Sequence, residues 1–181
     1  MNVLPPVWYV DRFDVLQHAA AIAPTDGLVL EFGVARGATV RALAGSAPLS
    51  NRLIYGFDSF LGLPEAWASY PAGHFACAIP EVPDNVELVV GMFAKTLAPF
   101  LAKHRDNAAL VHIDCDLYSS TRTVLDQLAP RIIPGTVIVL DEFWIVTDHE
   151  QRAFTEWVSM TGRRYRHEAR SIEQLCVVME S

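Results

Sequence analysis

The chain has 181 residues, 51% of them apolar and 19% charged, and a formal net charge of −7. This composition is typical of a globular protein with a substantial core, and the length favours a single domain spanning residues 1–181. The acidic balance argues against a nucleic-acid-binding surface as the main function.

The sequence predicts neither a membrane location nor an oxidising one. No apolar stretch reaches the roughly 18 residues of a membrane span, and the N-terminal stretch MNVLPPVWYVDRF lacks the basic and apolar regions of a signal peptide. Cys77, Cys115 and Cys176 are not spaced as metal ligands, so we expect free thiols in a reducing compartment. We therefore predict a cytoplasmic protein without a membrane partner.

Strands and helices alternate along most of the chain. Apolar spacing predicts a first helix over residues 11–23, which Pro24 ends. The stretches predicted as strands are then 27–34, 52–58, 86–93, 108–116 and 136–143, and the predicted helices between them are 37–47, 94–106 and 120–132. A long irregular stretch rich in aromatic residues, Gly and Pro covers 59–84.

The C-terminal part has a different pattern. A helix is predicted over residues 150–160, followed by two strand-like runs at 163–169 and 173–180 that favour an antiparallel hairpin. The alternation before it indicates a parallel sheet covered on both faces. In such open sheets, ligands bind beyond the carboxyl ends of the strands.

Two acids end the strand predicted at 108–116, in the sequence HIDCDLYSST. Strand side chains alternate, so His112, Asp114 and Asp116 should share one face. Because unpaired carboxylates are costly to bury, these acids should meet a ligand at the strand end. His112 itself fits a core histidine with a hydrogen-bond partner better than a ligand.

A glycine-containing turn follows the strand at 27–34. Glu31 ends that strand, and Gly33 and Gly37 follow in a G-x-x-x-G spacing, which is neither a dinucleotide G-x-G-x-x-G nor a phosphate loop. Asp58 ends the next strand, 21 residues after Gly37, where an acid can accept hydrogen bonds from ribose hydroxyls. The combination favours a nucleoside ligand, although a structural glycine turn and a helix-capping Asp58 remain alternatives.

Five segments together resemble the macrocin O-methyltransferase family. They are LEFGVARGATVRALA, YGFDSFLGLPE, GMFAKTL, HIDCDLYSST and PGTVIVLDEF, in the family's order and spacing, between about Leu28 and Phe143. Members of this family are class I S-adenosylmethionine enzymes that methylate sugar hydroxyls in natural-product pathways.

The resemblance implies a Rossmann-like, doubly wound, seven-stranded, mostly parallel sheet. It also implies an S-adenosylmethionine site, a magnesium site and a general base. The matching donor residues are Glu31, Gly33, Gly37, Asp58 and Ser59; the metal ligands are Asp114, Asp141 and Glu142; the general base is Asp116. Magnesium prefers carboxylate oxygens, and a cation beside a hydroxyl lowers its pKa, which agrees with these roles.

This chain departs from the family in two ways. Relatives usually carry two consecutive aspartates where this chain has Asp141 and Glu142, so Glu142 could bind metal differently. The chain is also short, so its acceptor site could be open, completed by a second subunit of a homo-oligomer, or adapted to another substrate. His149 is a second candidate base, or equally a residue in the first turn of an exposed helix.

Three functions are compatible with these features. The first is a magnesium-assisted O-methyltransferase acting on a hydroxylated small molecule or sugar. The second is a protein that binds S-adenosylmethionine or another nucleoside without catalysis. The third, a nicotinamide-dependent oxidoreductase, is disfavoured by the glycine spacing and by the lack of a Tyr-x-x-x-Lys pair.

Overall fold

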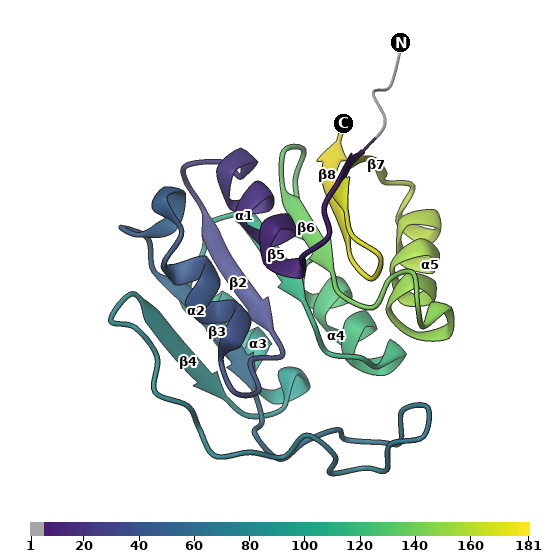
Figure 1. The fold of residues 1–181 in the computed structure, drawn as a ribbon. Coiled ribbons are helices and arrows are strands. Elements are labelled where there is room, and N and C mark those ends of the chain that lie inside the picture. The colour runs from purple at the N-terminus through teal and green to yellow at the C-terminus, as the bar shows by residue number, and fades with distance from the viewer. Residues whose placement is uncertain (1–5) are drawn as a thin grey trace.

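The computed structural model of the protein describes residues 6–181 (Figure 1). The helices are α1 (Arg12–Ile22), α2 (Ala38–Ala44), α3 (Phe93–Lys103), α4 (Tyr118–Leu128) and α5 (Arg152–Thr161). The strands are β1 (Val7–Trp8), β2 (Leu28–Phe32), β3 (Ile54–Asp58), β4 (Val86–Val90), β5 (Ala108–Ile113), β6 (Val137–Leu140), β7 (Arg164–Arg170) and β8 (Leu175–Glu180).

All of these strands form one sheet in the order β1-β7-β8-β6-β5-β2-β3-β4. The five strands from β6 to β4 run parallel, whereas β8 is antiparallel to both β6 and β7. The prediction of a doubly wound, mostly parallel sheet with a C-terminal antiparallel hairpin is therefore confirmed. The sheet has one strand more than predicted, because Val7 and Trp8 pair with β7 in a strand too short to show periodicity.

Two hydrophobic cores lie on opposite faces of the sheet, because successive strand residues point to opposite sides. On β2, Val29 belongs to the core under α1 and α2, while Leu30 and Phe32 belong to the core under α3, α4 and α5. Figure 1 shows these two helical layers on either side of the sheet. No helix in residues 6–181 is long and apolar enough to cross a membrane.

The central strands end earlier than the sequence predicted. β5 ends at Ile113, and the Asp114 N–H still donates to the Phe32 carbonyl at 2.8 Å, after which the backbone turns. Asp116 has a φ of +61°, in the left-handed region. His112 and Asp114 still have ligand atoms within 4.8 Å of each other, as expected for one strand face, and those of Asp114 and Asp116 are equally close. Asp116 reaches this position through a turn, so only the expectation that it extends the strand was wrong.

The start of α1 faces these strand ends. The Asp11 side chain accepts a hydrogen bond from the Phe13 N–H at 2.8 Å and so caps the helix. The cap makes Arg12 the first residue of α1. Its side chain reaches the acids after β5 and β6.

Candidate functional site

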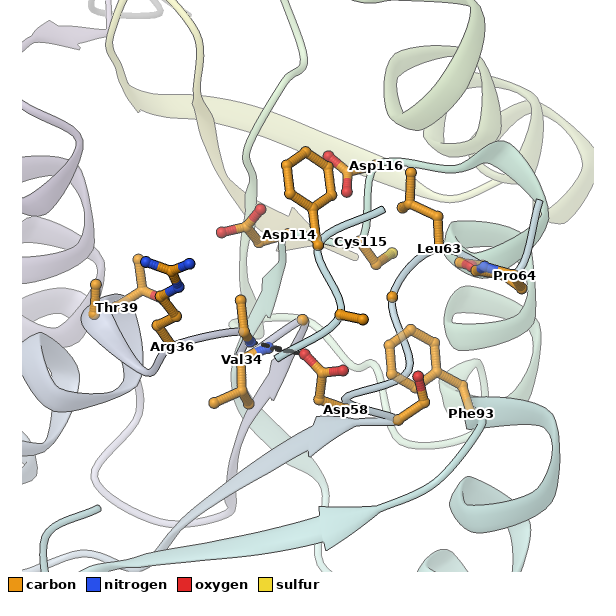
Figure 2. Close-up of a pocket in the computed structure, with 18 of the residues that line it drawn as sticks. Val34, Arg36, Thr39, Asp58, Leu63, Pro64, Phe93, Asp114, Cys115 and Asp116 are labelled. Atoms are coloured by element: carbon orange, nitrogen blue, oxygen red, sulfur yellow. Dashed lines mark hydrogen bonds between the residues drawn. The ribbon is translucent and has the colours of Figure 1, made fainter. Parts of the chain in front are cut away.

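A cavity of about 500 Å³ opens at the carboxyl ends of the parallel strands β2 to β6. Its walls come from the turns after these strands, from the start of α1 and from the long irregular stretch after β3. Figure 2 labels lining residues from the turns after β2, β3 and β5 and from the irregular stretch. Six of the site residues predicted from the sequence line this cavity: Gly33, Asp58, Ser59, Asp114, Asp116 and Glu142. The position agrees with the rule for ligand sites in open α/β sheets.

The glycine turn after β2 passes directly over the backbone after β5. Gly33 has a φ of +96°, and a Cβ there would lie 1.7 Å from the Asp114 carbonyl oxygen. Gly33 is therefore required by this backbone crossing, which brings the glycine turn and the acids into one site. Gly37, with a φ of +78°, is the N-cap of α2 and is not among the described residues that line the cavity.

Asp58 holds the glycine turn in place. Its Oδ2 accepts hydrogen bonds from the Val34 and Ala35 N–H groups at 2.8 and 2.7 Å, and its Oδ1 accepts from Phe60 N–H at 2.8 Å. None of these donors is at a helix N-terminus, so the alternative of a helix cap is wrong. A carboxylate accepts about four hydrogen bonds, so Oδ1 can accept one more.

Glu31 is fully buried rather than exposed in the cavity. It accepts from Thr39 Oγ1 at 2.9 Å, and its Oε2 lies 3.2 Å from His112 Nδ1. Burial lowers the pKa of His112, but the hydrogen bond to Glu31 and the charges of Glu31, Asp114 and Asp141 together raise that pKa overall. His112 therefore has the hydrogen-bonded core position expected from the sequence, and Glu31 links β2 to α2 and to β5.

Three carboxylates converge on the cavity. Ligand oxygens of Asp114, Asp116 and Glu142 all lie within 4.8 Å of one another. Burial, followed by the charge of Asp141, raises the pKa of Asp114 to about 7, that of Asp116 to about 6 and that of Glu142 to about 11. Such mutual repulsion indicates a group of acids that a cation would stabilise.

Arg12 supplies one such cation, and the sequence reasoning missed it. Its Nη2 lies 2.7 Å from Asp114 Oδ2 and 3.0 Å from Asp141 Oδ2. The guanidinium therefore bridges the two acids that follow neighbouring strands. No local pattern marks Arg12, because its partners lie more than 100 residues away in the sequence.

Asp141 is not among the described residues that line the cavity, although its carboxylate lies within 4.8 Å of ligand atoms of Asp114 and His112. Its side chain is fully buried, Oδ1 accepts from the Gln174 side chain, and Oδ2 faces Arg12 without hydrogen-bond geometry. Glu142 Oε2 is also buried without a hydrogen-bond partner among residues 6–181. An unpartnered Glu142 oxygen within 4.8 Å of ligand oxygens of Asp114 and Asp116 fits a magnesium ion, which prefers carboxylate oxygens. The residues present therefore suit this metal.

The π-helical turn at Thr147–Gln151 carries His149, the second candidate base. His149 Nδ1 accepts a hydrogen bond from the Tyr118 N–H at 3.3 Å, at the start of α4. His149 is not among the described residues that line the cavity. Asp116 makes no such contact with α4, whose N-cap is Leu117, so it does not cap that helix.

Comparison with known proteins identifies the chain. A methyltransferase domain family matches residues 30–143, more than half of the chain. The chain belongs to this family. The resemblance noted in the sequence is confirmed at this level, and with it the prediction of an S-adenosylmethionine-dependent methyltransferase.

The curated relatives of this methyltransferase are natural-product enzymes. It is 29% identical to the 8-demethyl-8-(2,3-dimethoxy-alpha-L-rhamnosyl)-tetracenomycin-C 4'-O-methyltransferase of Streptomyces olivaceus, over 91% of this chain and 76% of that protein. It is 27% identical to the mycinamicin III 3''-O-methyltransferase of Micromonospora griseorubida, over 74% of this chain and 63% of that one. The chain thus spans about three quarters of the first relative and less than two thirds of the second.

A solved structure supports the fold of the methyltransferase. The crystal structure of CalS11, a calicheamicin methyltransferase, aligns with a TM-score of 0.72 at 24% identity, over 92% of this chain and 76% of that one. The common sheet carries the cavity described above at the carboxyl ends of its parallel strands.

Proposed function

We propose that this methyltransferase transfers a methyl group from S-adenosylmethionine to a hydroxyl of a small molecule, most specifically a sugar hydroxyl of a natural product. The observation that carries the proposal is the convergence of Asp114, Asp116 and Glu142 on a cavity that the glycine turn also lines. A binding protein would need no group of acids with raised pKa values beside its nucleoside. The two O-methyltransferase relatives support the same reaction class.

The donor would lie along the glycine turn. Gly33, Val34 and Ala35 line the cavity beside Asp58, whose Oδ1 has room for one more hydrogen bond, in reach of a ribose hydroxyl. Ser59 lines the cavity next to it, and its Oγ accepts from Leu61 N–H at 3.2 Å. Glu31 and Gly37 would act indirectly, by holding the turn and the start of α2.

Magnesium would be held by Asp114 and Glu142, which line the cavity. Asp141 would join them if Arg12 moved, because the guanidinium faces the same Asp141 oxygen. A bound magnesium ion would orient the acceptor hydroxyl and lower its pKa. Glu142, one methylene longer than the aspartate usual in relatives, is the ligand with the most freedom to reach into the cavity.

Asp116 would be the general base. It lines the cavity, and the described residues give its side chain no hydrogen-bond donor, so its oxygens can accept a proton. As the acceptor oxygen attacks the sulfonium methyl, the carbon–sulfur bond breaks, S-adenosylhomocysteine leaves, and the hydroxyl proton passes to the Asp116 carboxylate. Positioned bases of this kind contribute about 10²–10⁴ in rate. His149 is less suited, because its Nδ1 is engaged by a backbone N–H.

Calorimetric titration and a transfer assay test the proposal. We expect binding of S-adenosylhomocysteine, no binding of NAD, and methyl transfer to deoxysugar glycosides or nucleotide sugars that depends on magnesium. Donor binding without transfer to any of these acceptors would favour the binding protein, and NAD binding would favour the oxidoreductase. Size-exclusion chromatography with light scattering would show whether a homo-oligomer completes the acceptor site.

A further inference from the structure

Glu150 lies at the centre of the acid cluster, although neither the sequence pattern nor the reaction described above assigns it a role. It belongs to the π-helical turn at Thr147–Gln151, and its side chain is fully buried. Oε1 accepts hydrogen bonds from the N–H groups of Cys115 and Asp116 at 3.0 and 3.2 Å. Oε2 accepts from the Asp141 N–H at 3.0 Å. One carboxylate thus binds the backbone of both acid-bearing turns.

The turn after β5 needs such support. Asp116 has a φ of +61°, a backbone conformation that costs free energy for any residue with a side chain. Such a conformation persists only where the surrounding structure enforces it. The Leu117 N–H closes this turn on the Cys115 carbonyl at 2.6 Å, and the Asp116 N–H donates only to Glu150 among the described residues. The Asp141 N–H, by contrast, also donates to the Ile113 carbonyl at 3.0 Å, so its contact with Glu150 is shared.

We propose that Glu150 is a positioning residue, which holds the backbone after β5 against that after β6 so that Asp114, Asp116 and Glu142 converge. This inference rests on the proposed function, because the converging acids are those assigned to the metal and the base. Glu150 does not line the cavity in the described part of the chain, so it acts through its neighbours. Residues that orient metal ligands in this way typically change metal affinity 10- to 100-fold when replaced.

Two substitutions separate positioning from charge. Glu150→Gln removes the charge but keeps one oxygen at the same reach, which can still accept from Cys115 and Asp116. Its NH2 then faces the Asp141 N–H, which keeps the Ile113 carbonyl as its acceptor. Glu150→Asp keeps the charge but withdraws the oxygens by one methylene, roughly 1.5 Å. Positioning predicts that the Asp variant loses at least tenfold in magnesium affinity while the Gln variant stays within about threefold of the original protein. A purely electrostatic role predicts the opposite order.

The measurements are magnesium and S-adenosylhomocysteine titrations by calorimetry, with hydrogen exchange over residues 112–117. We expect S-adenosylhomocysteine affinity within about twofold in both variants, and faster exchange in the Asp variant alone. The control is Glu156→Asp in α5, whose partners are Arg152 and Tyr118 rather than the acid turns, and which should change neither titration.

Three results would overturn the proposal. The first is an unchanged magnesium affinity in Glu150→Asp, and the second is an equal loss of magnesium affinity in both variants. The third is a parallel loss of magnesium and S-adenosylhomocysteine affinity, which would indicate general destabilisation. Absence of magnesium binding in the original protein would count against the metal in the proposed function. In that case hydrogen exchange tests the positioning role without magnesium. Unchanged exchange over residues 112–117 in Glu150→Asp would refute the positioning role.

Discussion

Replacing Arg12 by methionine removes the one positive charge that the described structure places between Asp114 and Asp141. Methionine keeps much of the apolar stem but not the guanidinium, whose Nη2 lies 2.7 and 3.0 Å from the two carboxylates. The variant would leave two acids facing each other, one of them fully buried. Its stability therefore measures how strongly this site needs a cation.

The size of the effect follows from burial. Removing one partner of a fully buried ion pair costs about 3–5 kcal/mol, but the Arg12 side chain is 34% exposed, so we expect about 2–3 kcal/mol after allowing for solvent screening. For a protein of this size each kcal/mol lowers Tm by about 2–4 °C, which gives a decrease of roughly 4–12 °C.

Magnesium should reverse this loss. A dication can replace the guanidinium, and a ligand at a hundred times its Kd stabilises a protein by about 2.7 kcal/mol, close to the expected loss. We also expect magnesium to bind Arg12→Met at least tenfold more tightly than the original protein, because Asp141 Oδ2 no longer faces a competing cation.

Calorimetric unfolding with and without magnesium, together with magnesium titration, checks both effects. The control is Arg122→Met, which removes a pair with the exposed Asp126 on α4 and should cost at most about 1 kcal/mol with no effect of magnesium. A metal-free Tm of Arg12→Met within 2 °C of the original, or equal stabilisation of both proteins by magnesium, would refute the reasoning.

Four further predictions follow from the site. Asp116→Asn should lower kcat by about 10²–10⁴ with unchanged S-adenosylhomocysteine affinity; a near-normal kcat would move the base elsewhere. Asp58→Ala should weaken S-adenosylhomocysteine binding by about 1.5–3 kcal/mol in calorimetry, because the glycine turn loses two hydrogen bonds to a charged group; unchanged affinity would contradict this role. Gly33→Ala should destabilise the protein far more than Gly73→Ala, since both have positive φ but a Cβ at Gly73 meets nothing within 4 Å; equal Tm values would show that the crossing with Asp114 tolerates a side chain. An excess of chelator should suppress methyl transfer and added magnesium restore it, while full activity in chelator would exclude a metal role.

Much of the site was visible in the sequence because its parts are local. Each acid or glycine stands at the end of a predicted strand, and the carboxyl ends of parallel strands meet at one edge of a sheet. That geometry alone predicts that Gly33, Asp58, Asp114 and Glu142 share a site, and all four line the cavity. The residue motifs that carry the family resemblance lie in the same turns.

The partner of each of these groups depends on how distant segments fold together. The alternation of strands and helices, and with it the mostly parallel sheet and the edge at which the site forms, can already be predicted from local patterns. Arg12 reaches Asp114 and Asp141, and Glu150 binds three backbone N–H groups, through contacts between segments far apart in the chain. Local periodicity does not encode such contacts, because it reports which face of an element is buried and not which partner that face meets. Gly33 shows the same division: its place in a turn is local, but the Asp114 carbonyl that makes glycine necessary comes from another strand.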